Sequence, residues 1–262
     1  MKSKPIIIIN GEPNSVFLEI FFKSIKYKKY STPLILISSL KLIRLQMKKL
    51  KFKANIKLID YQNIDKFKLE KNCINLIDIK YETNEAFEKI SKKSNLFIQN
   101  SFKIALELIN QGISNKLING PISKKSFLGK KYLGITEYLA NKSKSKSTAM
   151  LIYNKKLSVC PITTHLPIKM VARKIKKKLL FEKISLINDF YKRNRGFRPK
   201  IGVLGLNPHC ESIHKFNEDE KILKPAIKYL SKLGYKISGP FPADTIFLSN
   251  NRNKFDVIVG MY

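Results

Sequence analysis

Two histidines follow apolar segments at matching positions in the chain. His165 lies in Pro161-Ile-Thr-Thr-His-Leu-Pro167, after the apolar run Leu157–Cys160, and His209 ends the segment Ile201-Gly-Val-Leu-Gly-Leu-Asn-Pro-His209. In open α/β sheets, ligands bind outside the carboxyl ends of the strands. Imidazole binds Zn²⁺ and similar divalent metals well, and a catalytic metal needs about three protein ligands. The two histidines are therefore candidate metal ligands, and the alternative is that both are hydrogen-bonded polar side chains.

Three further positions carry groups that bind protons, phosphates or metals. Asp244 lies in a Pro-Ala-Asp-Thr turn, where its carboxylate is a candidate ligand or proton acceptor, with helix capping as the alternative. Thr136 and Glu137 stand at a predicted helix start, where a hydroxyl and backbone N–H groups can hold a phosphate; capping is again the alternative. Cys210 follows His209 directly. Its thiol is a candidate metal ligand, and the alternative is a small buried side chain.

The charge of the chain is strongly basic. Its 262 residues include 51 Lys and Arg against 19 Asp and Glu, which gives a net charge of +32. Such a balance is found in proteins that bind nucleic acids. Here the basic residues are spread over the whole chain, and a run of charge does not read bases by itself. We interpret it as solvated surface charge and keep a basic nucleic-acid-associated protein as a remote alternative, which a lack of duplex binding at low salt would exclude.

The composition also bears on location. Hydrophobic residues make up 44% of the chain, too many for a disordered protein. Apolar runs such as Ile6–Ile9 are far too short to cross a bilayer, and the N-terminus lacks the pattern of a signal peptide. Three widely spaced cysteines without a CxxC pair fit a reducing compartment. We therefore expect a cytoplasmic protein with no membrane partner.

Strand and helix patterns alternate along the chain. Predicted strands are Ile6–Ile9, Leu34–Ile37, Ile56–Ile59, Ile74–Ile77, Lys116–Asn119, Ile201–Leu204 and Asp256–Val259, with Thr148–Tyr153 and Leu157–Cys160 as a hairpin. Predicted helices are Ser15–Tyr27, Leu40–Leu50, Ala86–Ile90, Ser94–Gln111, Lys169–Lys177, Leu179–Tyr191 and Glu218–Leu233. The alternation predicts a mostly parallel α/β fold. A composition shift near Asn119–Pro121 places an approximate boundary between two α/β lobes, residues 1–118 and 119–262.

Six segments occur in an order that is typical of one enzyme family. They are Lys116-Leu-Ile-Asn-Gly-Pro-Ile-Ser-Lys124, Gly134-Ile-Thr-Glu-Tyr-Leu-Ala140, Thr163-Thr-His-Leu-Pro167, Gly205-Leu-Asn-Pro-His209, Gly239-Pro-Phe-Pro-Ala-Asp-Thr245 and Gly260-Met-Tyr262. The series resembles the 4-hydroxythreonine-4-phosphate dehydrogenase family of vitamin B6 biosynthesis. Before Lys116 the resemblance rests on Ile9-Asn-Gly-Glu-Pro13. It implies two α/β/α lobes with a cleft between them, as in isocitrate and isopropylmalate dehydrogenases, without the family's C-terminal part.

The resemblance also implies a reaction. Members of the family are homodimers that use NAD to oxidise a secondary alcohol of a small phosphorylated amino acid, 4-hydroxythreonine 4-phosphate. A divalent metal (Zn, Co, Mg or similar) held by three histidines polarises the alcohol oxygen, and the keto acid then loses CO₂. In this chain His165 and His209 match two metal ligands, Thr136 matches a phosphate-contacting residue, and Asp244 matches an acidic residue of the substrate site. Lys124 matches a family lysine to which no role is given, and the NAD-contacting residues are unidentified.

This sequence departs from the family pattern at several places. Ile135 stands where the family has a histidine, and the family's third metal histidine follows a Met-Tyr pair that here ends at Tyr262. His214 is a candidate substitute ligand in an altered loop. The departures keep open a catalytically impaired or inactive member, as a binder of phosphate compounds or a decaying gene product. A helix normally follows and covers a parallel strand, but no helix is predicted after the strand Asp256–Val259 in this sequence. We therefore also expect exposed apolar surface near Ile258.

Overall fold

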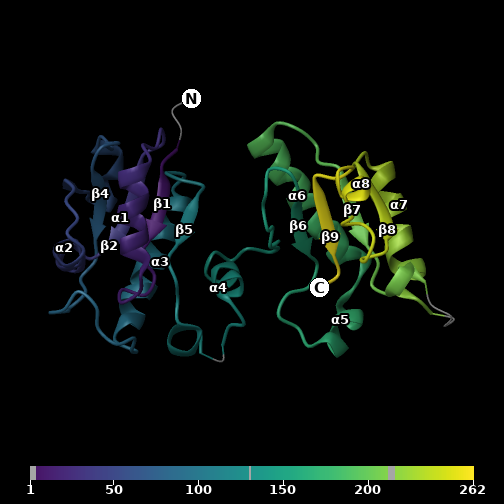
Figure 1. The fold of residues 1–262 in the computed structure, drawn as a ribbon, viewed down its shortest axis with the longest axis horizontal. Coiled ribbons are helices and arrows are strands. Elements are labelled where there is room, and N and C mark those ends of the chain that lie inside the picture. The colour runs from purple at the N-terminus through teal and green to yellow at the C-terminus, as the bar shows by residue number, and fades with distance from the viewer. Residues whose placement is uncertain (1–3, 130, 212–215) are drawn as a thin grey trace. The chain divides into compact units, whose positions relative to one another are not determined.

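The chain folds into two compact units, each with its own parallel sheet and helices (Figure 1). The computed structural model describes residues 4–129, 131–211 and 216–262. Unit 1 comprises Met1–Ile135 and unit 2 comprises Thr136–Tyr262. The α/β class with mostly parallel sheets, predicted from the alternating patterns, is confirmed. The units divide between residues 135 and 136, whereas the sequence placed an approximate boundary near residue 118.

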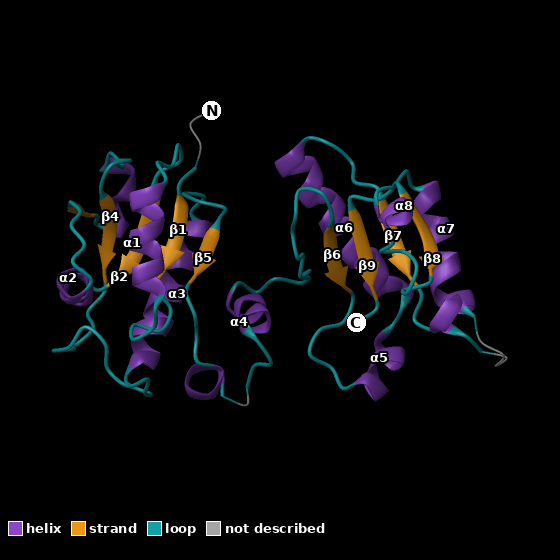
Figure 2. Cartoon of the chain, viewed as in Figure 1, coloured by secondary structure: helices purple, strands orange, loops and turns teal. Residues whose placement is uncertain are grey.

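Unit 1 is built on a five-stranded parallel sheet with the strand order β3-β4-β2-β1-β5 within the described residues. Its elements are β1 (Ile6–Ile9), α1 (Phe17–Tyr27), β2 (Leu34–Ser38), α2 (Leu40–Lys49), β3 (Ile56–Leu58), η1 (Tyr61–Lys66), β4 (Ile74–Asp78), α3 (Ser94–Asn110), β5 (Leu117–Asn119) and η2 (Lys124–Leu128). The central strands are rich in isoleucine and leucine because helices cover both faces of the sheet (Figure 2). Right-handed crossovers place α1 and α2 on one face and α3 on the other.

Local signals explain the helix ends of unit 1. The hydroxyl of Ser39 accepts a hydrogen bond from the Leu42 N–H at 3.3 Å, which confirms Ser39 as the N-cap of α2. Gly112 follows α3 with φ +77°, as its predicted position after the helix requires. The predicted helices Ser15–Tyr27 and Ser94–Gln111 are therefore found within two residues of their expected ends.

The segment 86–90, for which a helix was predicted, is irregular. Its backbone is engaged by side chains from other elements. Ala86 O accepts from Gln46 Nε2 at 2.8 Å, and the Glu88 N–H donates to Asn14 Oδ1 at 3.0 Å. These tertiary hydrogen bonds replace the local hydrogen bonds of a helix. The helix predicted from the pattern of residues 86–90 is therefore wrong.

The carboxyl ends of β1 and β5 approach very closely at two glycines. An ideal Cβ on Gly120 would lie 2.1 Å from Asn10 O, and one on Gly11, with φ +68°, would lie 2.5 Å from Pro121 O. The Glu12 N–H donates to Pro121 O at 2.8 Å. The Asn-Gly-Glu-Pro turn and the Gly-Pro segment, which both carried the sequence resemblance, therefore lie side by side in unit 1.

Unit 2 is built on a four-stranded parallel sheet with the order β6-β9-β7-β8 within the described residues. Its elements are α4 (Ile135–Lys142, starting at the boundary), β6 (Ser158–Pro161), α5 (Ile168–Lys174), α6 (Lys177–Arg195), β7 (Ile201–Leu204), η3 (Pro208–Cys210), η4 (Asp219–Leu223), α7 (Lys224–Lys232), β8 (Ile237–Phe241), α8 (Ser249–Arg252) and β9 (Val257–Gly260). The predicted hairpin is present only as one antiparallel bridge between Ile152 and Val159, whose backbone groups exchange two hydrogen bonds. Strand β6 instead obtains its ladder from parallel pairing with β9.

Both faces of β9 are buried. Val257 and Val259 pack into a cluster with residues of α5, α6 and α7, while Ile258 packs on the other face with Leu204 and Ile246. Ile258 is 0% exposed, so the expectation of exposed apolar surface there is wrong. The reason is that β9 is a central strand and that Ile246 and Phe255, from the segment that leads into it, pack on its second face.

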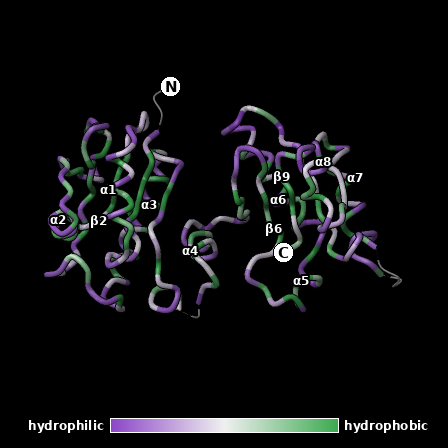
Figure 3. Tube along the Cα trace, in the orientation of Figure 1, coloured by the Kyte–Doolittle hydropathy of each residue, from purple (hydrophilic) through white to green (hydrophobic). Residues whose placement is uncertain are grey.

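Hydropathy follows this burial pattern. Hydrophobic residues concentrate in the strands of both units, β9 among them (Figure 3). Polar and basic residues lie on the loops and the outer helix faces, as solvated surface charge requires. Among the described residues, no helix combines the length and the apolar character needed to cross a membrane.

Candidate functional site

The carboxyl edge of the sheet in unit 2 gathers most of the predicted site residues. All four strands of this sheet run parallel, so their carboxyl ends meet at one edge. His165 follows β6, His209 follows β7 and Asp244 follows β8. Strand β9 lies between β6 and β7, and Tyr262 comes two residues after its end. The topology therefore places the two histidine loops on either side of the Gly-Met-Tyr segment.

His209 and Asp244 are brought together at this edge. His209 Nε2 lies 3.8 Å from Asp244 Oδ2, and the side chains are 76% and 62% exposed. An exposed pair at this distance contributes little to stability. The pair places an imidazole and a carboxylate side by side, and both groups can exchange protons with a ligand.

The two histidines share an uncommon backbone conformation. His165 and His209 both have φ +56°, and Cys210 has φ +62°. Non-glycine residues rarely adopt this left-handed region, which costs about 1–2 kcal/mol for each residue. Such strain clusters at functional sites, where the surrounding structure holds it in place. Histidine adopts this region more often than most non-glycine residues, but its presence after a strand does not predict the conformation.

Asp219 holds the loop that precedes His209. Its carboxylate is fully buried and accepts from Leu206 N at 2.7 Å, from Asn207 N at 3.0 Å and from Asn207 Nδ2 at 2.8 Å. Gly205 allows this approach, because a Cβ there would lie 2.7 Å from Cys210 Sγ and 3.0 Å from Asp219 Oδ1. Sequence reasoning missed Asp219, since an acidic residue near a helix start is ordinarily a capping residue.

The loop that carries His165 is also tied down. Thr163 Oγ1 donates to Met261 O at 2.8 Å, which joins the Thr-Thr-His segment to the Gly-Met-Tyr segment. Thr164 Oγ1 donates to Glu137 Oε1 at 3.4 Å, which joins the same loop to α4. The other oxygen of Glu137 is buried and has no hydrogen-bond partner among the described residues. Three of the recognised segments thus meet around the His165 loop.

Thr136 stands in the first turn of α4, half-buried. It lines a cavity of about 440 Å³ together with residues of α4, α6 and the segment 143–151. None of His165, His209 and Asp244 lines this cavity. Thr136 is connected to the strand-end edge through its neighbour Glu137. Lys124 belongs to unit 1, where it is exposed at the start of η2.

Cys210 is a small buried residue. Burial, with Asp219 nearby, raises the pKa of its thiol. Its burial favours the packing interpretation of Cys210 over the ligand interpretation.

The side chains at this edge include types that bind metals in other proteins. Imidazole and carboxylate donors are of the types that divalent metals accept. Among residues 4–129, 131–211 and 216–262, however, no three His, Cys, Asp or Glu side chains lie close enough together to hold a metal ion. His214, the candidate substitute ligand, lies outside the described residues. The donor types fit a metal, and the set of three is incomplete.

Comparison with known proteins gives a consistent result. The family model of the pyridoxal phosphate biosynthetic protein PdxA matches residues 29–262. The chain is 36% identical over 262 residues to the 4-hydroxythreonine-4-phosphate dehydrogenase of Sulfurihydrogenibium sp. (strain YO3AOP1), covering 98% of this chain and 79% of the relative. It is 29% identical over 269 residues to the D-threonate 4-phosphate dehydrogenase of Salmonella typhimurium, covering 100% of this chain and 82% of the relative.

The solved structures agree. The crystal structure of 4-hydroxythreonine-4-phosphate dehydrogenase from Klebsiella pneumoniae matches with a TM-score of 0.84 and 26% identity, covering 99% of this chain and 82% of that chain. A terephthalate 1,2-cis-dihydrodiol dehydrogenase from Burkholderia xenovorans LB400 matches with a TM-score of 0.67 at 20% identity, over 99% of this chain and 79% of that chain. At that identity the second likeness shows the fold alone.

Proposed function

The chain belongs to the PdxA family of pyridoxal phosphate biosynthetic proteins, and from this premise we propose that it is an NAD-dependent 4-hydroxythreonine-4-phosphate dehydrogenase. The family membership indicated by its motifs is confirmed. Relatives that carry this name support an oxidoreductase of pyridoxine biosynthesis. The proposed reaction oxidises a secondary alcohol of 4-hydroxythreonine 4-phosphate and then removes CO₂, with the help of a divalent metal.

One observation carries the proposal for this chain's own residues. The loops of His165 and His209 flank the end of β9, and His209 lies 3.8 Å from Asp244. Both loops hold their histidines in a strained backbone conformation, and buried side chains fix that conformation. Backbone strain of this kind is common at functional sites, and here it falls on two residues whose side chains are candidate ligands. The arrangement supports a reaction centre at this edge.

In the proposed reaction Asp244 is the proton acceptor. Oxidation breaks the O–H and C–H bonds of the alcohol: Asp244 would accept the proton, and NAD, when bound, would supply the hydride acceptor. The resulting keto acid loses CO₂, and the electrons of the broken C–C bond form an enolate that is then protonated on carbon. Thr136 would hold the substrate phosphate through its hydroxyl and the first turn of α4. His209 lies beside Asp244, with 3.8 Å between Nε2 and Oδ2.

A divalent metal (Zn, Co, Mg or similar), when bound, would polarise the alcohol oxygen and stabilise the enolate charge. We propose His165 and His209 as two of its ligands. A further donor is needed, because the described side chains complete no set of three. The proposal also includes a homodimer in the cytoplasm acting on a small phosphorylated amino acid, and it leaves the NAD-contacting residues unassigned.

Two specific observations support alternatives. The similarity to a D-threonate 4-phosphate dehydrogenase supports a related phosphorylated hydroxy acid as substrate. The incomplete donor set, together with Ile135 in place of the family histidine, supports a catalytically impaired member that still binds phosphate compounds. Both alternatives share the site described above and differ in what happens there.

The purified 262-residue chain distinguishes these functions. It is incubated with NAD, one of Zn²⁺, Co²⁺ or Mg²⁺, and either 4-hydroxythreonine 4-phosphate or D-threonate 4-phosphate, while NADH formation is followed by absorbance. We expect turnover of the first substrate, and a loss of roughly a hundredfold or more in kcat/KM for His209→Ala and for His165→Ala. Glu220→Ala, an exposed change on η4, is the control and retains full activity. Turnover of neither substrate would contradict the dehydrogenase and leave the impaired member.

A further inference from the structure

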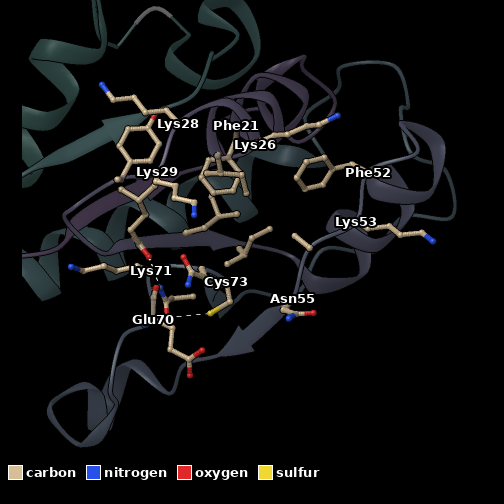
Figure 4. Close-up of a pocket in the computed structure, with 18 of the residues that line it drawn as sticks. Phe21, Lys26, Lys28, Lys29, Phe52, Lys53, Asn55, Glu70, Lys71 and Cys73 are labelled. Carbon is tan, nitrogen blue, oxygen red and sulfur yellow. Dashed lines mark hydrogen bonds between the residues drawn. The ribbon is translucent and has the colours of Figure 1, made fainter.

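Unit 1 contains a cavity of about 730 Å³ at the amino ends of its strands (Figure 4). It is lined by the first residues of β2 and β4, Leu34 and Ile74, and by Asn55 just before β3. Small-molecule pockets measure roughly 300–1,000 Å³, so the cavity has room for a ligand. Ligands of open α/β sheets ordinarily bind at the carboxyl ends of the strands. This cavity lies at the opposite end of the sheet in unit 1 and shares no residue with the proposed dehydrogenase site.

The floor of the cavity is apolar and aromatic. Phe21 and Ile25 reach it from α1, and Phe52 reaches it from the turn after α2. Phe52 stacks on the buried Phe22, with ring centroids 4.7 Å apart and planes 8° apart. Packing of this kind fixes the rings without a ligand. A planar apolar group would therefore find ring surfaces that are already in place.

The wall of the cavity is also fixed in advance. Asn75 is 1% exposed, and its Nδ2 donates to Leu34 O at 2.9 Å and to Glu70 O at 2.7 Å. Its Oδ1 accepts from Glu70 N at 2.9 Å. These bonds join the loop before β4 to the start of β2. The cavity is thus part of the folded unit, and a ligand would not have to order it.

The rim of the cavity is basic. The lining residues include six exposed lysines: Lys26, Lys28, Lys29, Lys51, Lys53 and Lys71. The one acidic lining residue, Glu70, accepts a hydrogen bond from Lys57 Nζ at 2.6 Å, and this bond lowers the pKa of Glu70. Figure 4 shows Lys29 extending toward the middle of the pocket, while Lys28 and Lys53 point outward. Lysines are abundant throughout this chain, so the position of Lys29 above an apolar floor is what singles out the cavity.

We propose that this cavity binds a phosphorylated small molecule with a planar ring, of the mononucleotide class. The ring would pack against Phe21 and Phe52, and the phosphate would pair with Lys29. An apolar floor alone would accept many neutral compounds, and a basic rim alone would accept any anion. The combination selects a ligand that carries both parts. The site contains none of Thr136, His165, His209 and Asp244, so we expect ligand binding there to be separate from the oxidation of the alcohol.

Cys73 provides a local test. It lines the cavity and is half-buried, whereas Cys160 and Cys210 are buried. Its reaction with a thiol reagent therefore reports on occupancy, at mildly alkaline pH because burial raises its pKa. We expect AMP and flavin mononucleotide to slow labelling of the full chain in a saturable way, on the order of tenfold at saturation. Cys73→Ser should remove the fast-labelling thiol and so identify the signal.

Charge reversal distinguishes a specific site from general attraction to a basic protein. Lys29→Glu should weaken the protection by AMP on the order of tenfold, whereas Lys178→Glu, the same change on the exposed surface of α6, should leave it unchanged. Turnover of 4-hydroxythreonine phosphate should be the same in both variants. The proposal is overturned if neither nucleotide protects Cys73, if both variants weaken protection equally, or if pyrophosphate protects as well as AMP. The readout is independent of dehydrogenase activity, so either proposal can fail alone.

Discussion

Among the described residues, Glu12 in unit 1 and Asp219 in unit 2 are the acidic residues buried as a whole, and their carboxylates are bonded very differently. Asp219 in unit 2 is 0% exposed, and both of its oxygens accept hydrogen bonds, from Leu206 and Asn207. Glu12 in unit 1 is 1% exposed, and its Oε1 accepts from Ser94 Oγ at 2.8 Å. Its Oε2 is buried without a hydrogen-bond partner among the described residues.

The difference follows from the backbone conformations of the loops at each edge. At the edge in unit 1 the sharp turn after β1 is made by Gly11, which adopts a positive φ at no steric cost. In unit 2 the corresponding conformations fall on His165, His209 and Cys210. A strained backbone conformation persists only where surrounding contacts hold it. For the loop before His209 these contacts are the hydrogen bonds to the Asp219 carboxylate, which we call the clamp. The same architecture thus gives a relaxed edge in one unit and a strained, clamped edge in the other.

Matched isosteric changes test this comparison with the largest expected effect. Asp219→Asn replaces an acceptor oxygen by an amide N–H₂ that must face a backbone or amide donor, so it should cost about 3 kcal/mol of unfolding free energy. Glu12→Gln can keep its oxygen toward Ser94 and turn its amide to the side that has no partner, so it should change stability by less than about 1 kcal/mol. Urea unfolding of the whole chain measures both.

The same pair of variants should differ in activity. Asp219→Asn should lower dehydrogenase turnover because it releases the loop before His209, and a metal-binding titration should show the weaker site. If Asp219→Asn and Glu12→Gln lowered the unfolding free energy equally, the two carboxylates would stabilise their edges to the same extent. The proposed special role of Asp219 would then be wrong.

A second contrast lies in the thiols of the two units. Burial raises the pKa of Cys160, in β6 of unit 2, from 9.0 to about 11. The folded state therefore keeps its proton where the unfolded chain loses it: the stabilisation is complete below pH 9 and is lost as the pH rises toward 11. The loss attributable to Cys160 should be about 2–3 kcal/mol over that window. Unfolding free energies of the native chain and Cys160→Ala, measured at several pH values, should converge by that amount.

Cys73 is the control for this titration. It is only half-buried in unit 1, and solvent screens its raised pKa, so Cys73→Ala should alter the pH profile much less than Cys160→Ala. Parallel profiles for the native chain and Cys160→Ala between pH 9 and 11 would show that the thiol of Cys160 is not protected from titration in the folded state.

Much of the fold was accessible from the sequence because its signals were local. The isoleucine-rich strands are buried on both faces, and Ser39 caps α2 through its own hydroxyl. The wrong structural predictions concern segments whose conformation or burial depends on residues distant in the sequence. The backbone of residues 86–90 bonds to Gln46 and Asn14, and Ile258 is covered because its strand is central in the sheet. Neither the tertiary partners nor the strand order can be read from a short window of sequence.

The candidate site was predicted in part for the same reason. Residue type and position after a strand made His165, His209 and Asp244 candidates, and the parallel strands bring their loops to one edge. The clamp was not predicted, because Asp219 acts through a buried carboxylate that reaches back to residues 206 and 207. The positive φ at both histidines depends on such contacts and has no signature in the residue types themselves.

The smallest expected effect separates structural strain from functional strain. Lys51 in unit 1 has φ +51° at the end of α2, where the Phe52 N–H donates to Met47 O in the manner of a glycine-terminated helix. Lys51→Gly should stabilise the chain by about 0.5–1 kcal/mol and leave turnover unchanged, whereas Lys51→Ala, which keeps the Cβ, should give no such gain. His209→Gly relieves the same conformation and should gain a similar amount, but it should lose turnover. If His209→Gly proved both more stable and fully active, the positive φ at His209 would be unrelated to activity, as it is at Lys51. The contrast between the two edges would then have no functional meaning.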